Sequence, residues 1–177
     1  MGSESNLVYV SLSKDAARLD YPGSSGSASC IIERQEGGML MTYFDKDGAI
    51  LHRKPVNPGK GIQEIAMETA KLLGKPVIGG EYAPVRLSKP CPLCGANALV
   101  EHRDSGVPII PIYRCESCGA KAFFLTDEYL SQLVKENIKA FSDEERSELD
   151  ANPGKFSKEL REYIIRIFAS KRIIGIK

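Results

Sequence analysis

The chain has 177 residues, of which 42% are hydrophobic and 27% charged, and its formal net charge is +1 at pH 7. This composition can build a globular core, and the small net charge gives no sign of a chain that binds nucleic acid along its whole length. No run of about 18 apolar residues is present, so we expect no membrane span. Residues 1–6 lack the basic and apolar regions of a signal peptide.

Cysteine usage points to a reducing compartment. Four of the five cysteines belong to one pattern described below, and the fifth, Cys30, lies in an apolar stretch. An isolated cysteine in such a stretch is typically a small buried side chain and not a nucleophile. We therefore expect a cytoplasmic protein, or a nuclear one if the cell has a nucleus.

Residues 1–86 predict an α+β domain that consists of an antiparallel β meander and a helix. Strand patterns occupy residues 7–12, 28–34, 39–45 and 49–53. Residues 36–38 and 45–48 separate the last three of these strands and contain glycine, as hairpin connections often do. The prolines of residues 55–59 are expected to end the sheet. Residues 61–73 then have the apolar spacing of an amphipathic helix, and residues 75–78 predict a short returning strand.

Two cysteine pairs, each followed by glycine, define the most informative part of the chain. Each pair places two sulfurs three positions apart across a tight turn, which Gly95 or Gly119 can close in the left-handed conformation. Two such turns that face each other form the tetrahedral four-sulfur cage that Zn²⁺ favours in closed structural sites. Iron in the same cage, disulfides and redox thiols are the alternatives. The predicted zinc ligands are Cys91, Cys94, Cys115 and Cys118.

With these two turns and the strand patterns of residues 98–102 and 108–113 between them, residues 87–125 resemble the zinc-ribbon superfamily. The resemblance implies one structural zinc ion, and a place among proteins of transcription, translation or RNA processing, or a structural clip in an enzyme. Transcript-cleavage factors of this superfamily carry an adjacent Asp-Glu pair at the hairpin tip. The tip here offers Asp104 alone, so that activity is not implied.

Residues 126–177 predict a helical C-terminal arm with a basic tail. Thr126 and Ser142 are in N-cap positions of two helices, and residues 152–154 separate the second helix from a third. The third helix carries apolar residues at helical spacing, with most of its basic residues expected on the opposite side. Residues 155–177 contain seven basic and two acidic side chains, which is typical of a local site for a polyanion or of pairing with the acidic segment before it.

The favoured hypothesis is a non-enzymatic nucleic-acid-binding accessory protein of transcription, translation or RNA handling. It assigns no catalytic residue and no cofactor besides the zinc ion. A protein–protein adaptor within a larger complex is the first alternative, with the hairpin as a docking element and the apolar arm as a partner-binding helix. The expected nucleic-acid contacts are Lys89, Arg103, Arg114, Lys121, Lys158, Arg161, Arg166, Lys171 and Arg172.

A metal-dependent nuclease is the second alternative. The order of the predicted strands and helix in residues 1–86, with Asp20 before the second predicted strand and Glu64 or Glu68 in the helix, loosely resembles a ribonuclease-H-type domain. Such nucleases need several carboxylates that converge on two metal ions about 4 Å apart. The acid expected on the following strand is missing unless Glu81 serves, so solvated surface acids are the competing interpretation.

Overall fold

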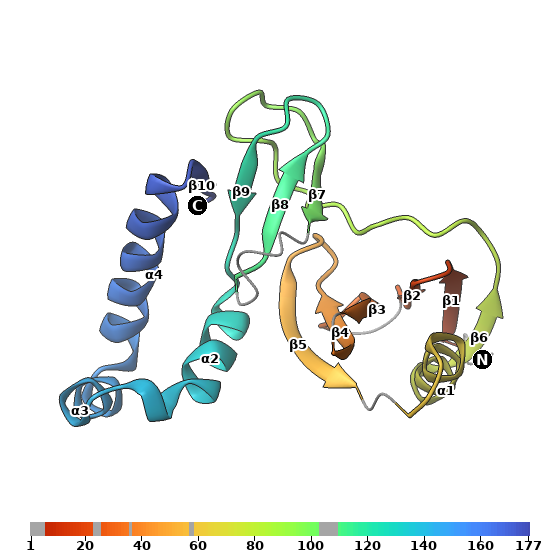
Figure 1. The fold of residues 1–177 in the computed structure, drawn as a ribbon, viewed down its shortest axis with the longest axis horizontal. Coiled ribbons are helices and arrows are strands. Elements are labelled where there is room, and N and C mark those ends of the chain that lie inside the picture. Colours follow the sequence, from red (N-terminus) through yellow and green to blue (C-terminus); the bar gives the residue numbers. More distant parts are fainter. Residues whose placement is uncertain (1–5, 23–25, 36, 57–58, 103–109) are drawn as a thin grey trace, which may run out of the picture. The chain divides into compact units, whose positions relative to one another are not determined.

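The computed structural model describes residues 6–22, 26–35, 37–56, 59–102 and 110–177. The chain divides into two compact units, Met1–Arg86 and Leu87–Lys177 (Figure 1). Each unit has its own sheet, the first with one helix and the second with three among the described residues, and the fold class is α+β as predicted. Among the residues described, no helix has the length and apolar content needed to span a membrane.

The first unit is a six-stranded sheet in the order β5-β4-β3-β2-β1-β6. Strands β1 to β5 form an antiparallel meander, which confirms the predicted topology. Helix α1 then returns the chain to the far edge, where β6 pairs in parallel with β1. The elements are β1 (Leu7–Leu12), β2 (Ala16–Asp20), β3 (Ser29–Gln35), β4 (Gly38–Phe44), β5 (Ile50–Val56), α1 (Ile62–Leu73) and β6 (Lys75–Ile78).

The core of this unit lies between the sheet and α1. Alternate residues of β1, Val8 and Val10, are fully buried, and so are Ala66 and Ala70 of α1, whereas Leu72 near the end of this helix is exposed. Cys30 of β3 is also fully buried, as expected. Burial raises the pKa of the Cys30 thiol to about 12, so this side chain stays a neutral apolar group at physiological pH.

The strands of this unit differ from the prediction in two ways: one strand was not predicted, and another is longer than predicted. Strand β2 was not foreseen, because Ala16–Asp20 contains only one large apolar residue, Leu19. Strand β5 continues through Pro55 to Val56 instead of ending before the prolines. Because β5 is an edge strand, the missing N–H of Pro55 leaves no gap in the interior of the sheet.

The second unit contains a four-stranded sheet in the order β10-β9-β8-β7. Strands β7 (Leu99–His102) and β8 (Ile112–Cys115) form the expected antiparallel hairpin. Strands β9 (Lys121–Phe123) and β10 (Ile173–Gly175) were not predicted. β10 pairs in parallel with β9, so the C-terminal residues return to the small sheet.

Helices α2 (Asp127–Glu136), α3 (Asp143–Ala151) and α4 (Pro153–Ser170) lie between β9 and β10, with a single 3-10 turn at Ile138–Ala140 (η1). The predicted caps are present: the side chain of Thr126 accepts a hydrogen bond from the N–H of Tyr129, and Ser142 forms a reciprocal capping box with Glu145. The side chain of Asn152 caps α4 by accepting a hydrogen bond from the N–H of Lys155. Local sequence therefore determines where each helix begins.

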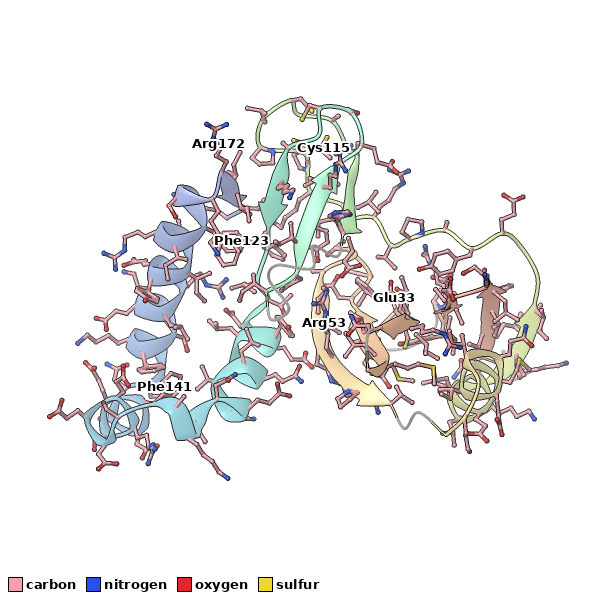
Figure 2. All side chains as sticks on the ribbon, in the orientation of Figure 1. Glu33, Arg53, Cys115, Phe123, Phe141 and Arg172 are labelled. Carbon is pink, nitrogen blue, oxygen red and sulfur yellow. The ribbon has the colours of Figure 1, made fainter. Side chains whose placement is uncertain are left out.

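Aromatic contacts hold α4 to the rest of the second unit. The ring of Phe123 in β9, labelled in Figure 2, has its centroid 5.1 Å from that of Phe168 in α4. At the other end of α4, Phe156 meets Phe141 edge-on at 5.5 Å. Phe156 and Phe168 are the two buried residues of α4. The remaining apolar residues of this helix, predicted to belong to a packed stripe, are half-buried or exposed.

Candidate metal centre

Two backbone turns of the same form bring the four cysteines together. The N–H of Gly95 donates to the carbonyl oxygen of Cys91 at 2.9 Å, and the N–H of Gly119 donates to that of Cys115 at 2.8 Å. Both glycines have a φ of 74°, the left-handed conformation that a residue with a Cβ rarely adopts. The expected role of both glycines in closing the turns is confirmed.

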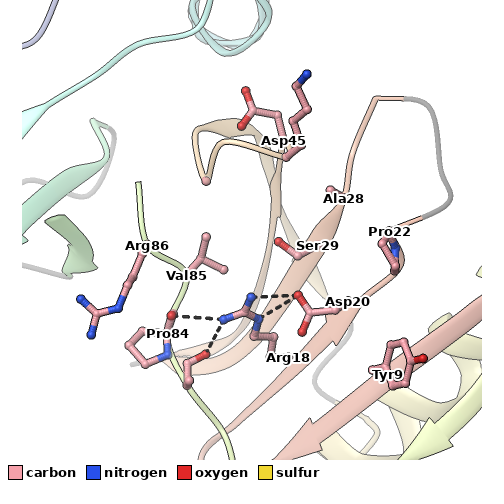
Figure 3. A pocket seen from close by; sticks show the side chains of 13 residues that line it. Tyr9, Arg18, Asp20, Pro22, Ala28, Ser29, Asp45, Pro84, Val85 and Arg86 are labelled. Carbon is pink, nitrogen blue, oxygen red and sulfur yellow. Dashed lines mark hydrogen bonds and ion pairs between the residues drawn. The ribbon is translucent and has the colours of Figure 1, made fainter. Parts of the chain in front are cut away.

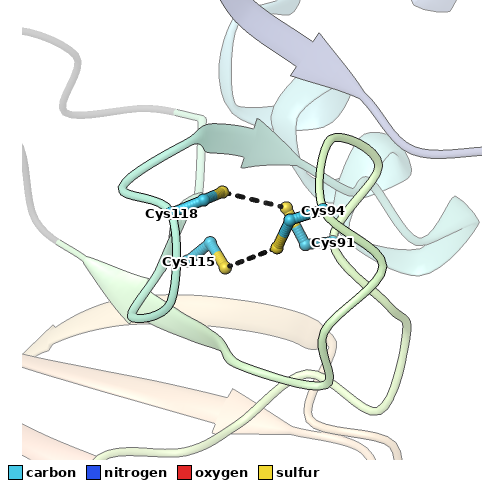
Figure 4. A group of neighbouring side chains, drawn as sticks. All are labelled: Cys91, Cys94, Cys115 and Cys118. Carbon is cyan, nitrogen blue, oxygen red and sulfur yellow. Dashed lines mark hydrogen bonds between the residues drawn. The ribbon is translucent and has the colours of Figure 1, made fainter.

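The four sulfur atoms form a compact cluster (Figure 4). The Sγ atoms of Cys91 and Cys118 are 3.7 Å apart, those of Cys94 and Cys115 are 3.6 Å apart, and all four lie within 4.8 Å of one another. A tetrahedral ion with metal–sulfur bonds of about 2.3 Å requires sulfur–sulfur distances of about 3.8 Å. The cluster therefore fits a single four-coordinate metal ion.

The electrostatics of the cluster also favour a cation. The backbone N–H groups of Cys118 and Ser117 lower the pKa of Cys115 to about 7. The N–H of Ala120 acts in the same direction on Cys118, but partial desolvation and the sulfurs of Cys94, Cys115 and Cys91 outweigh it and raise the pKa of Cys118 to about 12. Four thiolates this close repel one another, so all four ionise together only when a positive ion lies between them.

The surroundings of the cluster are those of a closed site. Cys91 and Cys115 are buried, and Cys94 and Cys118 are exposed. Leu99, the cross-strand partner of Cys115, is fully buried, and the N–H of Glu116 donates to the carbonyl oxygen of Ala98, which ties the second turn to the start of β7. Four cysteine ligands leave a tetrahedral ion no open position for water, so such an ion would stabilise the fold and would not activate water.

The predicted contact residues of the hairpin are partly brought together. Arg114 of β8 and Lys121 of β9 are direct cross-strand partners on one face of the small sheet. Lys89 lies with its Nζ 4.6 Å above the ring of Phe124, and this Nζ donates to the backbone oxygen of Lys177. Arg103 lies outside the described residues.

The basic residues of α4 and the turn after it do not gather on one face. Arg161 was expected on the polar side of the helix, but it donates to the carbonyl oxygen of Leu125 at 2.6 Å and to Asp127 at 2.7 Å. At 100° per residue, Lys158 and Arg166 lie about 80° apart around the helix axis. Lys171 is the C-cap residue and Arg172 follows the helix with a φ of 59°.

Two acids of the nuclease hypothesis, Asp20 and Glu68, are each paired with a basic side chain of the same unit. Asp20 accepts two hydrogen bonds from Arg18, which also donates to the backbone oxygens of Ala83 and Pro84, beside a hollow of about 530 Å³ (Figure 3). Glu68 pairs with Lys60 at 2.7 Å, and Glu64 lies in the first turn of α1. Within the described residues, the four cysteines are the only group of His, Cys, Asp or Glu side chains placed to hold a metal ion.

Comparison of the chain with protein-family models, with curated proteins and with solved structures found no match. The functional interpretation therefore depends on the geometry and chemistry of the residues described above.

Proposed function

We propose that the four cysteines hold one structural Zn²⁺ ion, and that the protein is a non-enzymatic accessory protein of transcription, translation or RNA handling. Its nucleic-acid contact would be the face of the small sheet beside the metal centre. Zn²⁺ is the ion expected because closed four-thiolate cages with tetrahedral geometry are its usual structural sites, and it brings no redox chemistry.

The observation that carries the proposal is the placement of Arg114 directly opposite Lys121. The pair concentrates positive charge on one face of the small sheet, which favours an anionic ligand there. A phosphate backbone offers closely spaced anionic groups. Arg114 is exposed to solvent and Lys121 is half-buried, so the guanidinium of Arg114 is the stronger candidate for a phosphate contact.

A second role for the same charges is compensation of the metal centre, because one Zn²⁺ with four thiolates is doubly negative. The two roles are separated by the variant Arg114→Gln. If Arg114 contacts phosphate, the variant loses nucleic-acid affinity and keeps its metal affinity. If Arg114 only balances the charge of the site, the variant loses metal affinity and binds nucleic acid as before.

The direct experiment is a fluorescence-anisotropy titration of zinc-loaded protein with single-stranded DNA, duplex DNA and RNA, at about 50 and 200 mM salt. We expect micromolar or tighter binding that weakens steeply with salt, and a several-fold loss in Arg114→Gln. Lys14→Gln, which removes one exposed positive charge from the first unit, is the matched control and should bind like the wild type. No binding at low salt, or equal losses in both variants, would refute the proposal.

An adaptor function is the second candidate, and one observation favours it. Tyr163 and Ile167 of α4 have 55% and 39% of their surface exposed, which is unusual for apolar residues that share one side of a helix. Such a surface suits a protein partner better than a phosphate backbone.

A further inference from the structure

Helix α4 carries apolar residues along more than one side, and its buried residues are Phe156, which meets Phe141, and Phe168. The packed side carries Phe168, which meets Phe123, and Arg161, which is bonded to the segment before α2. A second line of apolar residues continues from Phe156 along the helix, and we call it the outer stripe: Leu160, Tyr163, Ile164 and Ile167. Leu160 and Ile164 are half-buried, and Tyr163 and Ile167 are exposed.

The spacing of the outer stripe is that of a helix–helix seam. Leu160, Tyr163 and Ile167 are separated by three and then four residues, the spacing of the a and d positions of a coiled coil. Helix α4 has 18 residues, which corresponds to a length of about 27 Å at 1.5 Å per residue. The outer stripe covers residues 160–167 of this length, a little over one heptad of contact with one partner helix, because Phe156 at the preceding heptad position packs against Phe141.

The charges along the stripe select the partner and its direction. Glu159 and Arg166 are seven residues apart and therefore lie within about 20° of each other on the same flank of the stripe. A two-fold axis near Tyr163 would place Glu159 of one helix against Arg166 of an antiparallel copy, and Arg166 against Glu159, which gives two opposite-charge pairs. A parallel copy would instead bring Arg166 near Lys171 of its partner, and these two charges repel.

We propose that the outer stripe of α4 is a self-association surface, and that it pairs with the same helix of a second copy of this chain in antiparallel orientation. The contact buries Leu160, Tyr163 and Ile167 of both copies and is isologous, so it closes as a dimer and does not propagate. The proposal is independent of nucleic-acid binding. It depends on the apolar residues and the self-complementary charges of α4, and not on the face of the small sheet that carries Arg114.

The test is sedimentation equilibrium of the full-length, metal-loaded chain over a wide concentration range. We expect a reversible monomer–dimer equilibrium for the wild type. Glu159→Arg and Arg166→Glu should each raise the dimer dissociation constant about tenfold or more, because each single change creates two like-charge pairs. The double variant Glu159→Arg/Arg166→Glu should restore dimerisation to within about threefold of the wild type, since the two pairs are re-formed with their signs exchanged.

Two controls keep the result specific to the contact between copies. Lys158→Glu reverses a charge as Arg166→Glu does, but on the exposed side of the helix opposite the outer stripe, and should leave the dissociation constant unchanged. Glu159 also lies 3.7 Å from Lys155 within its own helix, so each variant is checked for helix content by circular dichroism. Residues 159 and 166 are about 10 Å apart along one helix, too far for the double change to compensate within a single copy.

A wild-type chain that stays monomeric at all concentrations would overturn the proposal, whether the stripe is then covered by another part of the chain or by a different protein. A dimer that is insensitive to Glu159→Arg, or a double variant weaker than both single ones, would also overturn it.

Discussion

The same substitution, glycine to alanine, should have opposite effects at two positions of the second unit. Gly119 closes the second cysteine turn with a φ of 74°, and an added Cβ would meet no atom within 4 Å. The cost of Gly119→Ala is therefore a backbone cost alone, about 1–2 kcal/mol for a left-handed residue with a Cβ. The lower entropy of the unfolded chain offsets about 0.4–1 kcal/mol of this, so we expect a net loss of about 1 kcal/mol.

Gly154 is the internal control. It lies in the first turn of α4, where a Cβ would be in ordinary contact with the Asn152 side chain at 3.9 Å. Alanine is favoured over glycine within a helix by about 0.5–1 kcal/mol, so Gly154→Ala should stabilise the unit. The two variants should thus differ by about 1.5–2 kcal/mol in the free energy of unfolding.

The assay is urea unfolding of the metal-loaded protein followed by circular dichroism. The free metal concentration is held constant with a chelator buffer, because bound metal stabilises the folded state by mass action. Gly119→Ala should also weaken the apparent metal affinity about fivefold, while Gly154→Ala should not. The argument is that the metal site needs a left-handed residue at position 119. It would be refuted if Gly119→Ala were neutral or stabilising, or if Gly154→Ala were as destabilising as Gly119→Ala.

Three further predictions concern buried or paired groups. Among the described residues nothing hydrogen-bonds to the buried Oγ1 of Thr42, so Thr42→Val should raise the urea midpoint by the equivalent of about 1 kcal/mol, and a lower midpoint would mean that the hydroxyl has a partner. Burial raises the pKa of Cys30 from 9.0 to about 12; the neutral thiol therefore stabilises the fold below pH 9, and this contribution is lost as the pH rises from 9 to 12. Cys30→Val should move alkaline unfolding, followed by circular dichroism, to higher pH, and an unshifted transition would contradict the assignment. Arg161→Lys keeps the charge but loses the fork that reaches both Leu125 and Asp127; we expect a loss of about 1 kcal/mol in urea unfolding, and no loss would show that the fork contributes nothing.

Features fixed by local chemistry could be predicted from the sequence. The two cysteine turns require a set spacing and a left-handed glycine, so the sequence around Cys91 and Cys115 was enough to indicate the cluster. The same holds for the capped helix starts at Thr126 and Ser142, where a side chain replaces a missing backbone partner. The glycine-containing connections likewise predicted the hairpins of the meander.

Features fixed by distant partners could not be predicted. Strands β9 and β10 have three residues each, too few for an apolar period. β9 forms by pairing with β8, and β10 by pairing with β9 across the intervening helices α2, α3 and α4. The side of α4 that packs inward was also misjudged. Arg161 turns inward because backbone and carboxylate acceptors near α2 satisfy its guanidinium, and Tyr163, which looked like a core residue, is left exposed.

The most direct test of the central claim is a titration of metal-free, reduced protein with Co²⁺, followed by absorption spectroscopy. A closed site of four cysteines predicts one Co²⁺ per chain, with the intense visible bands of a tetrahedral ion and a thiolate charge-transfer band in the near ultraviolet. Stoichiometric Zn²⁺ should then remove both signals. A chain that binds no Co²⁺, or that gives the weak spectrum of an octahedral ion, would contradict the assignment of Cys91, Cys94, Cys115 and Cys118 as a metal centre.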